Sequence, residues 1–321
     1  MDLEQVTLAQ LRYAVAVEQT RSFRLASERC HVSQSGLSMQ IQKLEELLGI
    51  RLFDRSKKPV LLTAEGARAL RQMREVLRET ERLGQAVAEE SEPAGRYRLG
   101  IIPTLAPTVM PLFLSAFLDA HPRVELLIEE LKTEEILARL DADTLDAGIA
   151  STPLRVPGLR ETALAREPMV AYLAAGDPLL ARKSVTQANL SERELWVLPE
   201  GHCFRSQVLS YCGSGKARPP RGVQFESGSF ETLMGLVDSG LGATVLPAMV
   251  AQGLPAAKRR ARVRPLARPT PVREIGLVTA RLQLRRRVTD ALIDTLRTQL
   301  SAALGPAVVS GSVLDPLPAS D

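Results

Sequence analysis

Three consecutive segments at the start of the chain place apolar residues three or four positions apart, the spacing of one helix face. Before each segment stands a residue whose hydroxyl can cap a helix, and these are Thr7, Ser22 and Ser33. Gly49 can end the third helix. Only a short link, 31–32, separates the second helix from the third, so the pattern predicts a helix-turn-helix.

The third predicted helix carries an unusual polar face. Its side chains can hydrogen-bond to base edges or phosphates, whereas an ordinary solvated face is rich in Lys and Glu. With the capping residue, this set is Ser33, Gln34, Ser35, Ser38 and Gln42. A basic strand–turn–strand pattern follows over 51–62, where Arg55 and Lys57 would meet the phosphate backbone. We therefore expect residues 1–66 to form a mostly helical winged helix-turn-helix domain that binds double-stranded DNA.

A helical segment rich in Arg and Glu follows, over 67–92, before Pro93. Apolar residues fall on a weak heptad seam that includes Leu70, Met73 and Leu77. The pattern fits a single solvated helix or a dimerisation helix. We treat residues 67–94 as a linker helix.

Beyond Arg96, strand-like and helix-like patterns alternate, which predicts a mainly parallel sheet covered by helices. The predicted strands are 97–101, 124–128, 145–150, 169–174, 195–198, 222–225 and 243–246, and the predicted helices are 109–120 and 133–140. We expect residues 95–304 to form this α/β region. The Gly- and Pro-containing tail 305–321 is expected to be disordered.

Composition narrows the class of protein. Three cysteines in 321 residues exclude a disulfide framework and favour a reducing cytoplasm. The acidic, amphipathic start has no signal-peptide pattern, and no apolar run is long enough to span a membrane, which disfavours a secreted solute-binding protein. The net charge of +4 permits nucleic-acid binding without requiring it.

Two of the three cysteines, Cys203 and Cys212, flank a segment that reads as a short helix. Nine residues of helix separate them by roughly 13 Å, whereas a disulfide needs Cα atoms within about 7 Å. A bond between them would require the helix to unfold, which is the physical basis of a redox switch. Inert buried thiols are the ordinary alternative. The spacing does not fit a zinc site, and no metal or cofactor is expected.

Three stretches together resemble the LysR-type transcriptional regulators. They are Val32 to Glu45 (VSQSGLSMQIQKLE), Leu48 to Arg55 (LGIRLFDR) and Leu62 to Gly66 (LTAEG). The resemblance implies that the polar residues of the third helix enter a DNA groove, that the linker helix pairs two chains, and that the α/β region forms two lobes like those of periplasmic binding proteins. Met39 departs from the small or basic residue common at its position.

A narrower resemblance, to the peroxide-sensing OxyR branch of that family, rests on Gly201-His202-Cys203 with Cys212 nine residues on. Supporting stretches are Ile102-Pro103-Thr104, Phe230 to Leu233, Gly242 to Pro247 and Arg273 to Val278. It implies that Cys203 is oxidised by hydrogen peroxide and that Cys212 resolves it as a disulfide. The residues it places around the sulfur are His202, Thr104, Thr133 and Arg273.

The resemblance also implies a homodimer or homotetramer that binds promoter DNA, activates antioxidant genes with RNA polymerase, and is not an enzyme. Two alternatives remain. One is a regulator of the same family in which a metabolite fills the crevice between lobes and the cysteines are passive. The other is a thiol peroxidase, which the DNA-binding head disfavours.

Overall fold

The computed structural model describes residues 5–87, 92–212, 229–280, 285–305 and 311–317. The chain divides into two compact units, Met1–Ser91 and Glu92–Asp321. Each unit is described by itself. No helix among the described residues is both long and apolar enough to cross a membrane.

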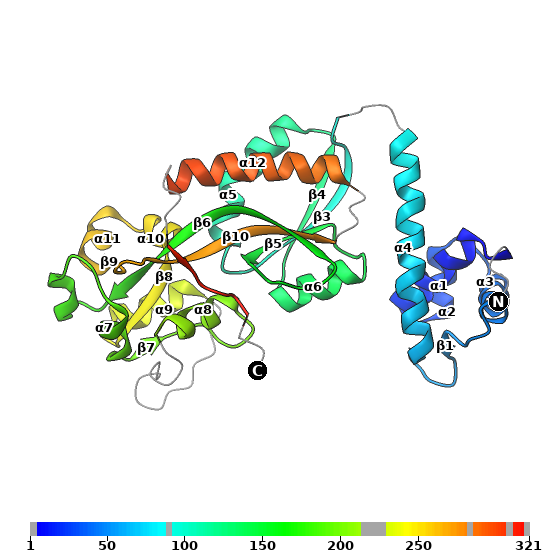
Figure 1. The fold of residues 1–321 in the computed structure, drawn as a ribbon, viewed down its shortest axis with the longest axis horizontal. Helices are drawn as coiled ribbons and strands as arrows, with labels where there is room; N and C mark the ends of the chain where they lie inside the picture. Colours follow the sequence, from blue (N-terminus) through cyan, green and yellow to red (C-terminus); the bar gives the residue numbers. More distant parts are fainter. Residues whose placement is uncertain (1–4, 88–91, 213–228, 281–284, 306–310, 318–321) are drawn as a thin grey trace. The chain divides into compact units, whose positions relative to one another are not determined.

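The first unit is a small helical domain with a two-stranded wing (Figure 1). Its elements are α1 Leu8–Thr20, α2 Phe23–Arg29, α3 Gln34–Leu48, β1 Phe53–Asp54, β2 Leu61–Leu62 and α4 Ala64–Val87. The three predicted capping hydroxyls each accept a backbone N–H of their helix. Leu37, Ile41 and Leu44 of α3 are fully buried in the core of this unit. Gly49 ends α3 with a φ of 68°.

Helix α4 begins at Ala64, three residues before the predicted start of the linker helix, and is described to Val87. Residues 88–91 lie outside the described part, and residues 92–94 are not helical. Leu70 and Met73 are buried in the core of the first unit. Arg74 also pairs with Glu18 of α1, with 2.7 Å between the charged groups. The first residues of the predicted heptad seam therefore pack within their own chain.

The described residues of the second unit form one continuous sheet of nine strands, in the order β4-β3-β5-β10-β6-β8-β7, with β11 paired to β10 and β9 to β6. The strands are β3 Gly95–Ile101, β4 Val124–Glu130, β5 Ala147–Thr152, β6 Leu159–Leu173, β7 Leu195–Trp196, β8 Ala243–Pro247, β9 Val263–Pro265, β10 Pro271–Ala280 and β11 Ser312–Val313. The helices are α5 Ala106–Ala120, α6 Thr133–Asp141, α7 Gln187–Ser191, α8 Cys203–Cys212, α9 Phe230–Asp238, α10 Ala248–Gln252, α11 Ala256–Arg262 and α12 Arg286–Leu304, with a short 3-10 turn at Pro178–Ala181.

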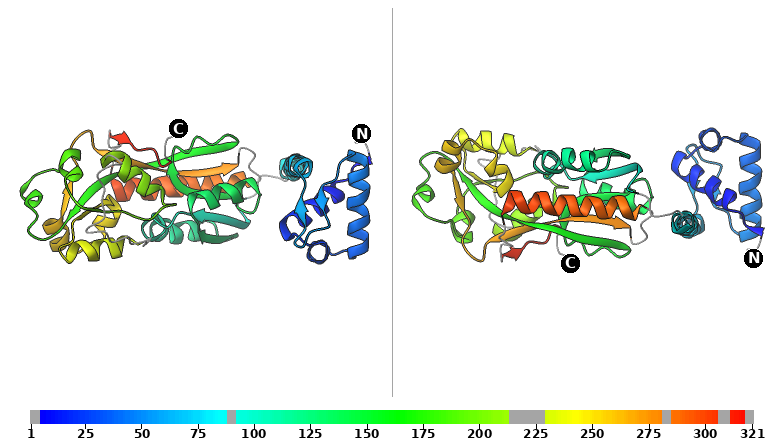
Figure 2. Two further views of the ribbon diagram at one scale, coloured as in Figure 1. Left: turned by 90° about the horizontal axis from the view of Figure 1, so that it is seen from below. Right: turned by 90° about the horizontal axis from the view of Figure 1, so that it is seen from above.

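Two hydrophobic cores divide the second unit into two lobes. The first core lies between β3, β4, β5 and the helices α5, α6 and α12, and the second lies around β7, β8, α8 and α9. Figure 1 shows β6 and β10 running from one lobe into the other. Helix α12 lies along β6 and beside α5 (Figure 2). The two-lobed α/β architecture implied by the resemblance is therefore present.

The pairing of strands is more mixed than the alternation of elements predicted. β3 is parallel to β4 and β5, but β10 is antiparallel to both β5 and β6, and β6 is antiparallel to β8. The crossing strands cause this difference, because the chain passes into the second lobe along β6 and returns along β10 in the opposite direction. The predicted strand 169–174 is only the last part of β6, and the predicted strand 222–225 lies outside the described residues.

The tail differs from its prediction of disorder. Residues 311–317 follow a defined path, in which β11 pairs in parallel with the first two residues of β10, matching Ser312 to Pro271 and Val313 to Val272. The composition of the tail gave no sign of this, because the stabilising contacts come from an open strand edge and from apolar side chains of both lobes. Residues 306–310 and 318–321 lie outside the described part.

Candidate functional site

The exposed face of α3 carries the residues that the sequence assigned to DNA. Gln34, Ser35 and Gln42 are exposed, and Ser38 is half-buried. Ser33 caps the helix, since its hydroxyl accepts the N–H of Gly36 at 3.1 Å. The polar surface of α3 is thus free to meet a nucleic acid, as a recognition helix in a major groove requires.

Met39 lies on the same exposed surface of α3, and 63% of it is accessible. A large apolar side chain so exposed on a recognition helix can contact the methyl group of thymine. The sequence marked this residue only as a departure from the family pattern.

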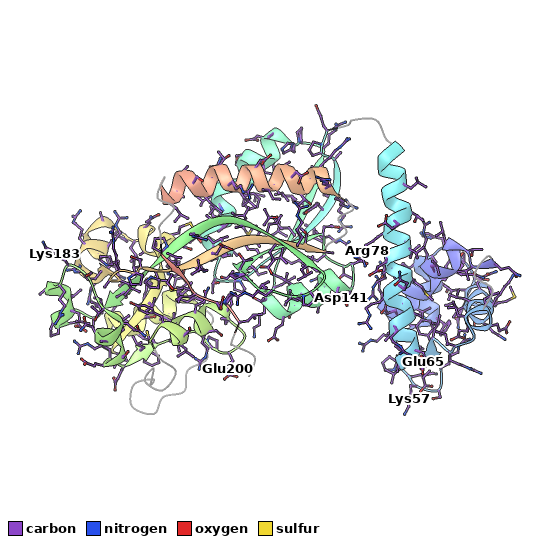
Figure 3. All side chains as sticks on the ribbon, viewed as in Figure 1. Lys57, Glu65, Arg78, Asp141, Lys183 and Glu200 are labelled. Carbon is purple, nitrogen blue, oxygen red and sulfur yellow. The ribbon has the colours of Figure 1, made fainter. Side chains whose placement is uncertain are left out.

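The two predicted basic residues of the wing differ in their surroundings. Lys57 is exposed and unobstructed at the β1–β2 turn (Figure 3). The guanidinium of Arg55 instead donates to Glu45 at 3.0 Å and to the hydroxyl of Ser38 at 3.1 Å, and it stacks 4.7 Å from the ring centroid of Phe23. Arg55 therefore fastens the wing to the recognition helix.

Glu45 links α3 to the wing, a structural contact that the sequence reasoning missed. It is an acid on the buried face of α3, with only 8% accessible. One oxygen accepts the backbone N–H of Leu52 at 2.7 Å and that of Phe53 at 3.3 Å, and the other accepts from Arg55. This carboxylate therefore joins α3 to the backbone at the start of the wing and to the Arg55 side chain.

Helix α8 carries the two cysteines at its first and last residues. Both are free thiols and both are buried, with 6% of Cys203 and 2% of Cys212 accessible. Cys203 belongs to the core of the first lobe, whereas Cys212 belongs to the core of the second. The helix thus connects the two lobes, and its intact turns hold the sulfurs too far apart to bond.

A cavity of about 280 Å³ opens beside Cys203. Its walls come from the start of α6, the loop before α8, the first turn of α8 and the C-terminal tail; they are Thr133, Glu134, Glu200, Gly201, His202, Arg205, Ser206, Pro316 and Leu317. Figure 3 labels Glu200, which precedes α8 in this wall. The hydroxyl of Thr133 is buried and has no hydrogen-bond partner among the described residues. A buried hydroxyl without a partner is costly unless a small polar molecule supplies the bond.

The electrostatics around the two sulfurs differ. Cys203 is the first residue of α8, so its sulfur lies beside the backbone N–H groups of the first helical turn and their partial positive charge. Burial, followed by the nearby charge of Lys132, lowers the pKa of His202 below its ordinary value of 6.5. The imidazole is therefore neutral at physiological pH and can serve as a hydrogen-bonding group rather than a cation. Burial raises the pKa of Cys212 to about 11, so its thiol stays protonated.

Arg273 is fully buried and does not line this cavity. Its guanidinium pairs with the fully buried Glu167 at 2.7 Å and donates to the hydroxyl and carbonyl of Thr104 at 3.4 and 3.3 Å. It also lies 5.5 Å from the ring centroid of Phe204, the residue after Cys203. Thr104 is therefore oriented by Arg273, and the charge of Arg273 is already matched by Glu167.

The structure brings Cys203, His202 and Thr133 to one cavity, places Thr104 and Arg273 in an adjoining buried network, and keeps Cys212 at the far end of α8. The sequence reasoning missed Glu167, whose oxygens bind Arg273 and the N–H of Met249 at 2.7 Å. It also missed Gln207, Pro316 and Leu317. Glu167 stands between Arg166 and Pro168 and outside the predicted strand 169–174, so its local sequence gave no signal, and the tail gave none either.

Two families match this chain. The family described as bacterial regulatory helix-turn-helix protein, lysR family, matches residues 8–67, and the LysR substrate binding domain matches residues 90–301. The chain is 34% identical to the DNA-binding transcriptional dual regulator OxyR of Escherichia coli strain K12, over 92% of this chain and 96% of that protein. It is 35% identical to a probable hydrogen peroxide-inducible genes activator of Mycobacterium avium, over 85% and 88% of the two chains.

Solved structures give the same result. A cysteine-to-aspartate variant of full-length OxyR from Pseudomonas aeruginosa superposes with a TM-score of 0.77 at 34% identity, covering 91% of this chain and 95% of that one. A hydrogen peroxide-bound mutant of Corynebacterium glutamicum OxyR superposes with a TM-score of 0.61 at 28% identity, covering 93% and 95%.

Proposed function

The chain belongs to the LysR family of bacterial transcriptional regulators, and from this premise we propose that it senses hydrogen peroxide through Cys203 and Cys212 and switches transcription of antioxidant genes. One observation carries the proposal. The two free cysteines stand at opposite ends of one helix, and Cys203 adjoins a cavity in which the buried hydroxyl of Thr133 lacks a partner. A small polar oxidant such as hydrogen peroxide can form the hydrogen bond that this hydroxyl lacks. In addition, the 34% identical relative from Escherichia coli is named OxyR.

In the first step, the thiolate of Cys203 attacks one oxygen of hydrogen peroxide. The S–O bond forms as the O–O bond breaks, and the departing hydroxide takes up one proton and leaves as water. The cysteine is thereby oxidised to a sulfenic acid. Thr133 and the neutral His202 hydrogen-bond the peroxide, and Thr104, oriented by Arg273, completes the polar surroundings.

In the second step, the sulfur of Cys212 attacks the sulfenic sulfur and expels water, which leaves a disulfide. The thiol of Cys212 must give up its proton, and burial opposes this while α8 is folded. The two sulfurs also cannot meet until α8 unwinds. Unwinding therefore brings the sulfurs together and also removes the burial that keeps Cys212 protonated.

The signal reaches DNA because α8 contributes to the cores of both lobes. Refolding this helix changes the packing of each lobe. In a homodimer or homotetramer, that change alters the spacing of the paired DNA-binding domains along the operator. RNA polymerase is recruited at the rearranged promoter complex. The protein works as a regulator rather than as an enzyme: each chain reacts with one hydrogen peroxide molecule, and reductants in the cytoplasm then restore its thiols.

The sharpest test is non-reducing peptide mapping after about one equivalent of hydrogen peroxide is added to the reduced full-length protein. We expect a peptide pair joined through Cys203 and Cys212 within seconds, together with a shifted footprint on promoter DNA. A Cys203→Ser variant should keep the reduced footprint, and Cys30→Ser should behave as the wild type because Cys30 lies in the first unit. If all three cysteines remain unmodified, the metabolite-sensing alternative replaces this proposal.

A further inference from the structure

The C-terminal segment Gly311–Leu317, here called the strap, pairs with the first residues of β10 (Figure 1). The N–H of Ser312 donates to Thr270 at 3.1 Å, and the N–H of Leu314 donates to Val272 at 3.0 Å. A Cβ at Gly311 would overlap the carbonyl oxygen of Thr270, so only glycine permits this close approach. Glycine at position 311 therefore allows the start of the strap to lie directly against β10.

The strap also holds the middle of α8. Gln207 is fully buried, and its Nε2 donates to the carbonyl of Leu314 at 2.8 Å. Its Oε1 is buried and has no hydrogen-bond partner among the described residues. The orientation of this amide in the helix thus depends on the strap.

The remainder of the strap touches both lobes. Leu314 packs against the second core and Leu317 against the first. The exposed carboxylate of Asp315 pairs with Arg155 of the first lobe at 3.2 Å. Pro316 and Leu317 then form part of the cavity beside Cys203. One short segment therefore contacts the helix that must refold, both lobe cores and the oxidant cavity.

We propose that the strap is a brake on disulfide formation, with Gln207 and Leu314 as positioning residues that keep α8 helical until Cys203 is oxidised. This inference rests on the proposed function. The step from thiolate to sulfenic acid, with release of water, leaves α8 folded and the strap in place. The step from sulfenic acid to disulfide, in which the S–O bond breaks, a second water leaves and the S–S bond forms, requires α8 to unwind. Unwinding carries Gln207 away from Leu314.

The brake can be weakened from either side. Gln207→Leu replaces the amide in α8 with a shorter apolar side chain that cannot donate to Leu314. Gly311→Val displaces the start of the strap without changing α8. Ser312→Ala, which alters an exposed side chain of the same strap, is the matched control. One disruptive variant changes α8 and the other changes the strap. An effect that both variants show is therefore due to the contact between the strap and α8.

Each step has its own measurement in the full-length protein. Sulfenic acid formation is measured by dimedone trapping in a Cys212→Ala background, and disulfide formation is measured by rapid-quench mass spectrometry with Cys212 intact. We expect the first rate to change by less than about twofold in all variants. The second rate should rise about fivefold in Gln207→Leu and Gly311→Val, because the sulfenic acid form with α8 still folded loses one hydrogen bond, and should stay unchanged in Ser312→Ala.

The outcomes separate the two proposals. If the wild type forms the disulfide and both disruptive variants form it at the wild-type rate, the strap is no brake and the proposed function stands. If the rates of sulfenic acid formation and of disulfide formation both fall in the disruptive variants, the strap only supports the fold, and the brake proposal is overturned. If the wild type forms neither sulfenic acid nor disulfide, the peroxide function fails, and the brake fails with it.

Discussion

At the scale of single residues, the hydroxyl of Thr133 has no evident structural role, since it is buried without a partner in the described protein. We therefore expect Thr133→Val, a substitution of nearly equal volume, to leave the free energy of unfolding unchanged or to raise it by up to about 1 kcal/mol. The same variant should form sulfenic acid about tenfold more slowly, because the peroxide loses one hydrogen bond. Urea unfolding and dimedone trapping measure the two quantities.

Thr133→Ser keeps the hydroxyl and serves as the matched control, with a rate close to that of the wild type. A Val variant that reacts as fast as the wild type would show that Thr133 takes no part in the reaction. Thr104 gives a useful contrast, because its hydroxyl already accepts from Arg273. Its removal should disturb folding as well as the reaction.

Residue types with distinct chemistry were the ones that sequence alone could identify. The cysteine pair stands out because the chain has only three cysteines. The polar face of α3 stands out because it is rich in Ser and Gln, whereas an ordinary solvated helix face is rich in Lys and Glu. Glu167 and Gln207 could not be found this way, since their importance lies in partners more than 100 residues distant, Arg273 and Leu314. The role of Arg55 in fastening the wing depends likewise on where Glu45 lies in three dimensions.

At the scale of elements, α8 must be stable in the reduced protein and yet able to open. Burial raises the pKa of Cys212 from 9.0 to about 11. The folded state then holds the thiol proton more tightly than the unfolded state does, so this contribution to stability is complete below about pH 9 and is lost as the pH rises through about 11. We expect the contribution of Cys212 to the free energy of unfolding to fall by about 2 kcal/mol between roughly pH 8.5 and 10.5.

The measurement compares Cys203→Ser with the double variant Cys203→Ser, Cys212→Ala in urea at each pH under reducing conditions. Their difference isolates Cys212 from the other groups that titrate in this range. A difference that stays constant with pH would mean that Cys212 already meets solvent in the folded protein, and α8 would then not need to open for the thiol to ionise.

Elements with a periodic pattern were predictable, and those defined by distant partners were not. The helices of the first unit were predicted from their capping residues and apolar faces, and the elements of the second unit were predicted from the alternation of strand-like and helix-like patterns. The extension of β6 to Leu159 and the existence of β11 could not be read from the sequence. In both cases a neighbouring strand, β10, supplies the hydrogen bonds that local propensity does not.

At the scale of the regulatory unit, the two lobes are joined by β6 and β10, and the buried pair Glu167–Arg273 bridges these strands at directly opposed positions. Glu167 also accepts the N–H of Met249 at the start of α10, while Arg273 reaches Thr104 in the first lobe. Removing one charge leaves the other buried without its partner, which typically costs 3 to 5 kcal/mol, whereas removing both is far less costly.

We therefore expect Glu167→Leu and Arg273→Leu each to lower the free energy of unfolding by about 3 to 5 kcal/mol, and the double variant to lower it by much less than the sum. Asp290→Asn, which breaks an exposed pair with Arg286 on α12, is the matched control and should change stability little. Urea unfolding of the four variants completes the cycle. Additive losses would show that the two charges act independently.

The same cycle separates stability from sensing. In the double variant the lobes remain joined, but Thr104 has lost both of the donors that Arg273 supplied. We expect this variant to fold, to bind promoter DNA in its reduced form, and to form sulfenic acid more slowly than the wild type. A double variant that folds and reacts at the full rate would confine Glu167 and Arg273 to joining the lobes, and would leave His202 and Thr133 as the groups that act on the peroxide.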